Sequence, residues 1–188
     1  MKPTEKVIVE AFGELLEEKP LNKITVRDIV ERCGINRNTF YYHFQDIPGL
    51  LEQLLKDKAD WMIQNNAKPG SVTDCLSLLV GYVQRHKKAA LHIYQSLSRE
   101  TFVDNLETVA SYTVTEYVDQ FIQQLGYQVR EQDKAYLIRY YKCTFVGVIL
   151  DWMDAELNYD LCAVVDRVCV LMEGSAVKAF ARSAGIEQ

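Results

Sequence analysis

Residues 24–44 of the chain read Ile-Thr-Val-Arg-Asp-Ile-Val-Glu-Arg-Cys-Gly-Ile-Asn-Arg-Asn-Thr-Phe-Tyr-Tyr-His-Phe, and this stretch decides the fold. Thr25 has a hydroxyl that can cap a helix. Four apolar side chains then recur at helical spacing, namely Val26, Ile29, Val30 and Cys33. Gly34 permits the left-handed backbone that a tight turn after a helix requires. The first half of the stretch is therefore predicted to be a short helix that ends at a glycine turn.

The second half predicts another short helix with a more polar outer face. Ile35 is expected to hold the turn against the core, and Asn36 can cap the helix that follows. Phe40, Tyr41 and Phe44 supply aromatic surface for packing. The residues expected to face outward are Arg37, Asn38, Thr39, Tyr42 and His43. Because Arg can bridge guanine and Asn can bridge adenine in the major groove, these two helices predict a helix-turn-helix that reads DNA.

The pattern Thr-x-Arg-Asp-Ile, then Gly-Ile, then Arg-x-Thr-Phe-Tyr-x-His-Phe resembles the DNA-binding domain of the tetracycline-repressor-type (TetR) family of transcriptional regulators. The resemblance covers roughly the first third of the chain. It implies an all-α protein, in which a three-helix DNA-binding domain is joined by a long helix to a C-terminal helical bundle that dimerises. It also implies the contacts with DNA. Base edges would be met by Arg27, Asn36, Arg37, Asn38 and Tyr42, and phosphates by Thr25, Thr39, Tyr41 and His43.

Two positions depart from the family pattern. Family members usually carry a phosphate-contacting lysine three residues after the Phe of the His-Phe pair, where this chain has Ile47. The inner face of the first helix carries Val30 where an alanine is usual, which is expected to change how the two helices cross. The alternative interpretation of the whole stretch is a plain helical hairpin with a charged outer face.

The charge of the chain is unusual for a DNA-binding protein. The 188 residues carry a formal net charge of −5. Between Lys19 and Gln45, five basic residues stand against two acidic ones, which leaves a local charge of +3. This basic face is modest, so specific base contacts are expected to carry more of the discrimination than bulk electrostatics.

The remaining sequence predicts helices throughout, and hence a helical bundle. A first helix ends before Pro20, and another starts near Pro48 and continues to about Asn66. We place the end of the DNA-binding domain within that helix, giving domains at 1–55 and 56–188. Four further segments are predicted: 72–97, interrupted near Lys87-Lys88, then 100–125, 131–156 and 160–184.

The last two predicted helices are apolar on more than one face, so both faces must be buried. We expect a homodimer interface there, formed by Phe145, Ile149, Trp152, Val168 and Leu171. The alternative is that all of these side chains belong to the core of one subunit. A two-fold protein also matches the palindromic sites that helix-turn-helix dimers read.

Aromatic residues with polar tips gather in the first helices of the bundle. They suit a pocket for a small hydrophobic or aromatic effector, lined by Tyr82, His86, Phe102, Tyr112, Tyr117, Tyr136 and Tyr140. An ordinary aromatic core has the same composition. By the TetR resemblance an inducer binds between these helices, although the sequence does not name it. A regulator controlled by a protein partner is a further alternative.

An enzyme is not expected, because the sequence has no phosphate-binding glycine loop, no Ser-His-Asp or Cys-His pattern on a strand-turn-helix and no metal-ligand spacing. His86 and His92 are six residues apart, which would place them on different faces of a helix. No cofactor is expected. The five cysteines lack a CxxC pair and are interpreted as small buried hydrophobes in a reducing cytoplasm, with a redox-sensing pair as the alternative. Neither a signal peptide nor a run of the ~20 apolar residues of a membrane span is found.

Overall fold

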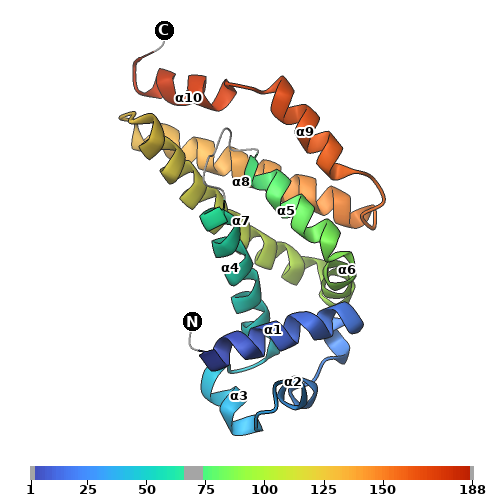
Figure 1. Cartoon of the computed structure of the whole chain (residues 1–188). Coiled ribbons are helices and arrows are strands. Elements are labelled where there is room, and N and C mark those ends of the chain that lie inside the picture. The colour runs from blue at the N-terminus through green and yellow to red at the C-terminus, as the bar shows by residue number, and fades with distance from the viewer. Residues whose placement is uncertain (1–2, 66–73, 187–188) are drawn as a thin grey trace. The chain divides into compact units, whose positions relative to one another are not determined.

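The computed structural model describes residues 3–65 and 74–186, and within these ranges the chain is helical with no strand (Figure 1). In chain order the elements are α1 (Pro3–Glu18), the 3-10 helix η1 (Leu21–Lys23), α2 (Val26–Cys33), α3 (Arg37–His43), α4 (Ile47–Asn65), α5 (Asp74–Arg85), α6 (Lys87–Ser96), α7 (Arg99–Leu125), α8 (Glu131–Asp154), α9 (Leu161–Leu171) and α10 (Ser175–Ser183). The predicted all-α fold is confirmed.

The chain forms two compact units. The first comprises Met1–Lys58 together with His86–Asn105, and the second comprises Ala59–Arg85 together with Leu106–Gln188. The chain therefore passes from one unit to the other three times. Two of these passages lie within the continuous helices α4 and α7, and the third lies between α5 and α6.

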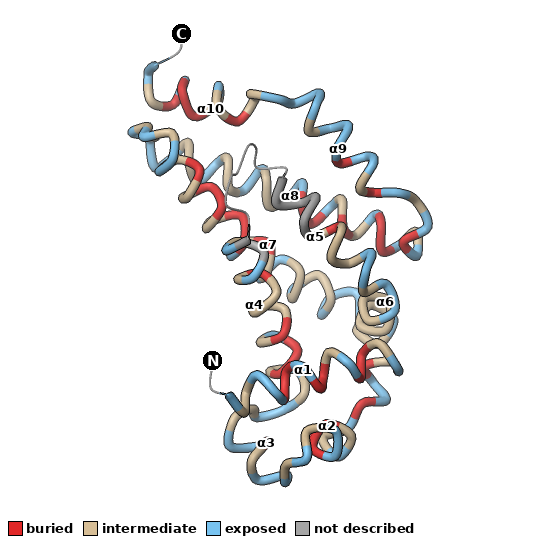
Figure 2. The backbone as a smooth tube through the Cα atoms, viewed as in Figure 1, coloured by how far each residue is buried: buried red, intermediate tan, exposed pale blue. Residues whose placement is uncertain are grey.

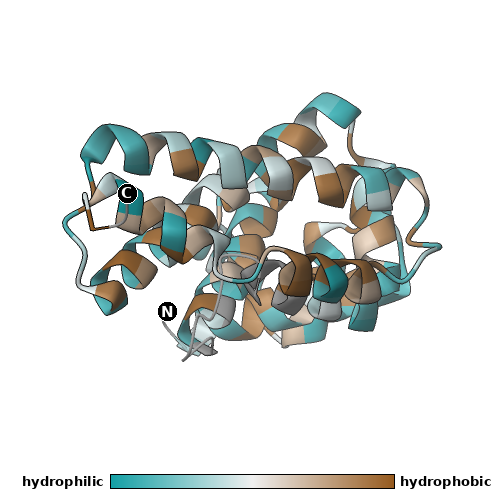
Figure 3. Ribbon diagram, turned by 90° about the horizontal axis from the view of Figure 1, so that it is seen from above, coloured by the Kyte–Doolittle hydropathy of each residue, from teal (hydrophilic) through white to brown (hydrophobic). Residues whose placement is uncertain are grey.

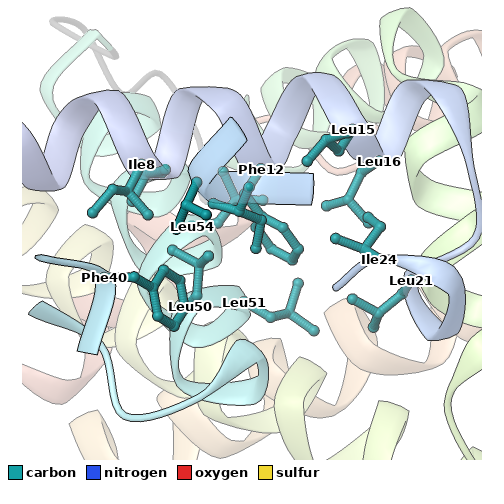
Figure 4. Packing of buried hydrophobic residues seen from close by; sticks show 13 residues of the cluster. Ile8, Phe12, Leu15, Leu16, Leu21, Ile24, Phe40, Leu50, Leu51 and Leu54 are labelled. Atoms are coloured by element: carbon teal, nitrogen blue, oxygen red, sulfur yellow. The ribbon is translucent and has the colours of Figure 1, made fainter. Parts of the chain in front are cut away.

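One hydrophobic cluster holds the first unit together. Figure 4 shows side chains of α1 directed toward those of α4, with Phe40 of α3 completing the layer. The fully buried members include Ile8, Phe12, Leu16, Ile29, Phe40 and Leu50. Burying one such side chain contributes about 1.5–3 kcal/mol, so this cluster fixes how α2 and α3 are held.

The α6 helix belongs to the same unit. Ala89, Ile93 and Leu97 recur at a spacing of four residues, and all three pack against the cluster of α1 and α4. The α6 helix thus belongs to the first unit, although residues 59–85 separate it in the sequence from the rest of that unit.

The second unit has its own core. Val114, Tyr117, Val118 and Phe121 lie on the buried face of α7 and pack with Ala176 and Phe180 of α10. Ser183 at the end of α10 donates to Asp133 over 2.7 Å and accepts from the backbone N–H of Arg130, which fixes α10 to the start of α8. Hydrophobic and hydrophilic residues are interspersed along the helices, as Figure 3 shows.

Most helix boundaries agree with the sequence prediction. The α1 helix ends before Pro20, and the interruption expected near Lys87-Lys88 lies at His86. The single helix predicted over 160–184 is wrong, because α9 ends at Leu171 and α10 begins at Ser175. Gly174 lies between them with φ +74°, a left-handed conformation that stops a helix at low cost only for glycine. The predicted start at Val72 lies outside the described residues.

Candidate DNA interface

The start of α2 is fixed by a reciprocal cap. The Thr25 hydroxyl accepts from the backbone N–H of Asp28 over 3.2 Å, and the Asp28 carboxylate accepts from the backbone N–H of Thr25 over 2.7 Å. Gly34 follows the helix with φ +65° and ψ 31°. The predicted cap and glycine turn are both confirmed. They set the length of α2 and the angle at which the chain enters α3.

Asn36 caps α3, and the cap engages the oxygen of its side-chain amide. Its Oδ1 accepts from the backbone N–H of Thr39 over 2.9 Å and from the Thr39 hydroxyl over 3.1 Å. Only the amide NH₂ of Asn36 then remains for DNA. A bidentate contact with adenine needs the oxygen as well. We therefore expect Asn38, rather than Asn36, to make any such contact.

The α3 helix divides its residues between the core and the solvent (Figure 2). Phe40 is fully buried and Phe44 packs on the same cluster. Arg37, Asn38, Tyr41 and Tyr42 are exposed. This is the distribution that a recognition helix needs, because its base-reading side chains must extend away from the domain.

His43 is less available than the sequence suggested. Its side chain is 7% exposed, and its Nδ1 lies 3.2 Å from the Glu5 carboxylate of α1. Glu5 thereby ties the end of α3 to α1. Only Nε2 of His43 is left to approach a phosphate.

Most of the positive charge of the helix-turn-helix is engaged in ion pairs. Lys19 lies 2.9 Å from Asp28, and Arg27 lies 2.6 Å from Glu31. The hydrogen bond from Lys19, together with those from Thr25, holds the pKa of the Asp28 carboxyl well below its usual range. The hydrogen bond to Glu31 raises the pKa of Arg27.

Arg32 of α2 is ion-paired with carboxylates of α1. Its guanidinium contacts Glu18 over 2.7 Å and Glu14 over 3.1 Å, and these two carboxylates raise its pKa. Of the five basic residues counted between Lys19 and Gln45, Lys23 and Arg37 make no side-chain ion pair with any residue that the structure describes. Lys23 was not among the predicted DNA contacts, and the structure places it exposed on η1.

Ile47, at the position where family members usually carry a phosphate-contacting lysine, packs in the core. Ile47 is half-buried and packs against the cluster of α1 and α4. The start of α4 is capped by Asp46, whose Oδ1 accepts from the backbone N–H of Gly49 over 2.8 Å. A carboxylate therefore occupies the helix N-terminus at which a phosphate would otherwise bind. Val30, the other departure, is buried in the same cluster.

The residues predicted to line an effector pocket lie in different environments. In the second unit Tyr117 is buried, Tyr82 is half-buried, and Tyr136 and Tyr140 are exposed. Tyr112 donates to Asp60 over 2.6 Å, a hydrogen bond that raises the pKa of Tyr112 to about 12. In the first unit Phe102 stacks edge-on against Tyr94, and His86 contacts Glu17.

The residues predicted for the dimer interface divide into two groups. Phe145, Ile149 and Trp152 of α8 are buried within the single chain. Val168 and Leu171 of α9 are 42% and 65% exposed, and Val164, one turn earlier, is 48% exposed. These three α9 residues, at i, i+4 and i+7, share one helix face. We call them the α9 stripe.

Other kinds of site have little support in the described residues. No group of three His, Cys, Asp or Glu side chains is placed there to hold a metal ion. Burial raises the pKa of the Cys33 and Cys162 thiols, which lowers their reactivity. The side chain of Cys75 lies outside the described residues. None of the described helices combines the length and the hydropathy needed to cross a bilayer.

Two family models match this chain. The model described as "Bacterial regulatory proteins, tetR family" matches residues 8–54, and the model described as "Transcriptional regulator C-terminal region" matches residues 71–174. Together they cover the helix-turn-helix and most of the bundle. The chain belongs to the TetR family of DNA-binding transcriptional regulators.

Individual relatives support this assignment. The chain is 30% identical over 84 residues to the dhaKLM operon transcriptional activator DhaS of Lactococcus lactis, covering 45% of each protein. It is 36% identical over 73 residues to the regulator EthR of Mycobacterium tuberculosis, covering 37% of this chain and 34% of EthR. The aligned region thus spans about half the length of these curated relatives or less.

Solved structures share the fold over nearly the whole chain. A structure of the dihydroxyacetone kinase operon activator DhaS aligns with a TM-score of 0.68 and 21% identity, covering 95% of this chain and 98% of that one. A TetR regulator from Rhodococcus sp. RHA1 aligns with a TM-score of 0.66 and 19% identity, covering 90% and 94%.

Proposed function

We propose that this protein is a repressor that binds a palindromic operator as a homodimer and acts without catalysis in the cytoplasm. The observation that carries the proposal is the exposed polar face of α3, with Arg37 and Asn38 in its first turn and a buried Phe40 behind them. A dimer seated over a promoter excludes polymerase without further contacts, which makes repression the simplest outcome.

Each reading helix would enter the major groove with its first turn. Arg37, Asn38 and Tyr42 would meet base edges, with Arg27 added once it leaves Glu31. Thr25, Thr39, Tyr41 and the Nε2 of His43 would meet phosphates. Lys23 joins this second group, because it is exposed and its ammonium has no carboxylate partner among the described residues. Because each helix-turn-helix has few basic side chains outside ion pairs, we expect DNA affinity to depend only weakly on salt concentration.

A second copy of the chain would cover the α9 stripe. Val164, Val168 and Leu171 form an apolar face that the described residues leave 42–65% exposed. Two-fold pairing through this face would place two helix-turn-helix units on one DNA molecule, matching the symmetry of a palindrome.

A small hydrophobic or aromatic effector would act on the second unit. Support comes from α7, where Thr113 is buried beside Tyr117 and its hydroxyl has no hydrogen-bond partner among the described residues. A ligand with one polar group would satisfy that hydroxyl. A ligand that stabilises a separation of the two reading helices other than about 34–36 Å would release DNA.

The direct test is selection of bound duplexes from a random pool by the purified protein at low salt. We expect a two-fold symmetric sequence with half-sites one helical turn apart. If no duplex is enriched, the proposal is wrong.

Activation is the second candidate, and the similarity to the activator DhaS favours it. Transcription from a promoter that contains the selected site separates the two, since a repressor lowers the transcript level and an activator raises it. Control by a protein partner would be indicated if no small molecule released DNA while a bound protein did.

A further inference from the structure

The last turn of α1 lacks one backbone hydrogen bond, because the residue that would donate it is a proline. In an α-helix the carbonyl of Leu16 accepts from the backbone N–H four residues later. That residue is Pro20, which has no N–H. The Leu16 carbonyl is therefore left without its helical donor at the point where α1 meets η1.

A histidine of α6 supplies the missing donor. His92 Nδ1 lies 2.7 Å from the Leu16 carbonyl oxygen, across a separation of 76 residues in the chain. A carbonyl oxygen only accepts, so Nδ1 of His92 must carry the proton. Both residues lie in the first unit, and the contact is part-buried, which makes an unpaired carbonyl costly.

The histidine that directly precedes α6 contacts the adjacent residue of α1. His86 Nδ1 lies 2.6 Å from the Glu17 carboxylate. His86 is also the first residue after the chain passes from the second unit into the first, and its φ of −114° and ψ of 37° interrupt the helical path between α5 and α6. The passage is thus anchored to α1 at the point where the helix is broken.

The same turn of α1 holds α2. Glu14 and Glu18 bind Arg32, and Lys19 binds Asp28, which is half of the cap of α2. Residues 14–19, the last turns of α1 with the residue after it, are therefore bonded both to α6 with the histidine before it and to the first helix of the helix-turn-helix. We call these residues the α1 junction.

We propose that His92, assisted by His86, is a positioning residue that replaces the missing cap of α1 and makes the orientation of α2 and α3 follow α6. The proposal deepens the proposed function and rests on it for the effect on operator binding.

The experiment compares His92→Ala and His92→Gln in the full-length protein, with Gln95→Ala as the matched control. Gln95 is an exposed residue of α6. The glutamine amide retains an N–H donor, so it tests the hydrogen bond rather than the ring. Three quantities are measured: amide hydrogen exchange over residues 14–33, the melting temperature, and affinity for the duplex recovered by selection.

We expect His92→Ala to speed exchange in the α1 junction and in α2, and to lower operator affinity several-fold, with a small change in melting temperature. His92→Gln should restore part of both effects, and Gln95→Ala should change neither. Unchanged exchange over residues 14–19 in His92→Ala would overturn the proposal.

Nitrogen NMR of the unaltered protein provides a test that does not depend on a variant folding. We expect the neutral His92 ring to carry its proton on Nδ1, and a proton on Nε2 instead would overturn the proposal. If no duplex is enriched by the protein, the proposed function fails. The exchange and NMR results still decide the role of His92.

Discussion

The α3 and α9 helices both leave side chains exposed in the single chain, but the chemistry of these side chains is opposite (Figure 2). On α3 the exposed set includes Arg37, Asn38 and Tyr42, which carry hydrogen-bonding groups that water can satisfy. On α9 it is the apolar α9 stripe. A polar face is stable without a partner, whereas a contiguous apolar face marks an interaction site. We therefore propose a transient polar partner at α3 and a lasting apolar one at α9.

The largest effect is expected from a charge placed in the α9 stripe. Val168→Glu should give monomers, because a carboxylate cannot be buried unpaired between two copies. Affinity for a palindromic duplex should fall by at least about a hundredfold as the second helix-turn-helix is lost. Sedimentation or mass photometry at micromolar concentration measures the first effect, and titration of the duplex measures the second.

Val170→Glu is the matched control, since Val170 is also exposed but lies roughly 100–160° around α9 from the three stripe residues. It should remain dimeric. Equal behaviour of the two variants would show that the stripe has no special role.

On the polar side, Arg37→Ala should weaken binding of the selected operator by ~1–3 kcal/mol and relax specificity at one base pair of each half-site. Its oligomeric state and melting temperature should not change, because Arg37 makes no ion pair within the described residues. Binding measured against operator variants at each position tests this. A uniform loss over all positions would assign Arg37 to a phosphate instead.

A smaller effect is expected where an α3 residue serves the fold. Asn36→Ala removes the cap of α3 and should lower the free energy of unfolding by about 1 kcal/mol. Urea denaturation measures this loss, and Asn36→Asp, which keeps an acceptor for the Thr39 N–H, should recover most of it. An unaltered stability in Asn36→Ala would mean that the cap contributes little.

The smallest effect is expected from Glu31→Gln. Glu31 holds Arg27 along α2 over 2.6 Å and adds negative charge beside the reading face. Removing that charge should raise DNA affinity, by less than about tenfold, at low salt, and the gain should shrink as salt is added. Titrations at two salt concentrations measure it. A loss of affinity would mean that Glu31 orients Arg27 for its base contact.

The helix-turn-helix was predictable because its signals are local. Thr25 caps α2 through Asp28, and Asn36 caps α3 through Thr39, each across three residues. Gly34 adopts the left-handed conformation that only its lack of a side chain makes inexpensive. Helix ends of this kind can be read from the residues that form them.

Long-range pairings were not predictable in the same way. Sequence spacing placed His86 and His92 on different faces of one helix, but His86 precedes α6 and both side chains meet α1. The count of +3 over residues 19–45 also misses that Arg32 is held by Glu14 and Glu18. The contacts of His86, His92 and Arg32 with α1 depend on the tertiary arrangement.

The sequence also did not predict which apolar side chains of a helix are buried within the chain and which are exposed. Both α8 and α9 are apolar around more than one face, yet Trp152 is fully buried in the chain while Leu171 is exposed. Likewise Tyr117 is buried and Tyr140 is exposed, although both were expected to line one pocket. Composition predicts that such a helix is buried, but not which neighbour buries it.

The central claim, that two copies read two half-sites, is tested most directly by native mass spectrometry of the protein with selected duplexes. The account predicts two copies on a palindrome whose half-sites lie one helical turn apart, about 34–36 Å. It also predicts a sharp loss of the complex when half a turn is inserted between the half-sites. A complex with one copy, or binding indifferent to the spacing, would contradict the account.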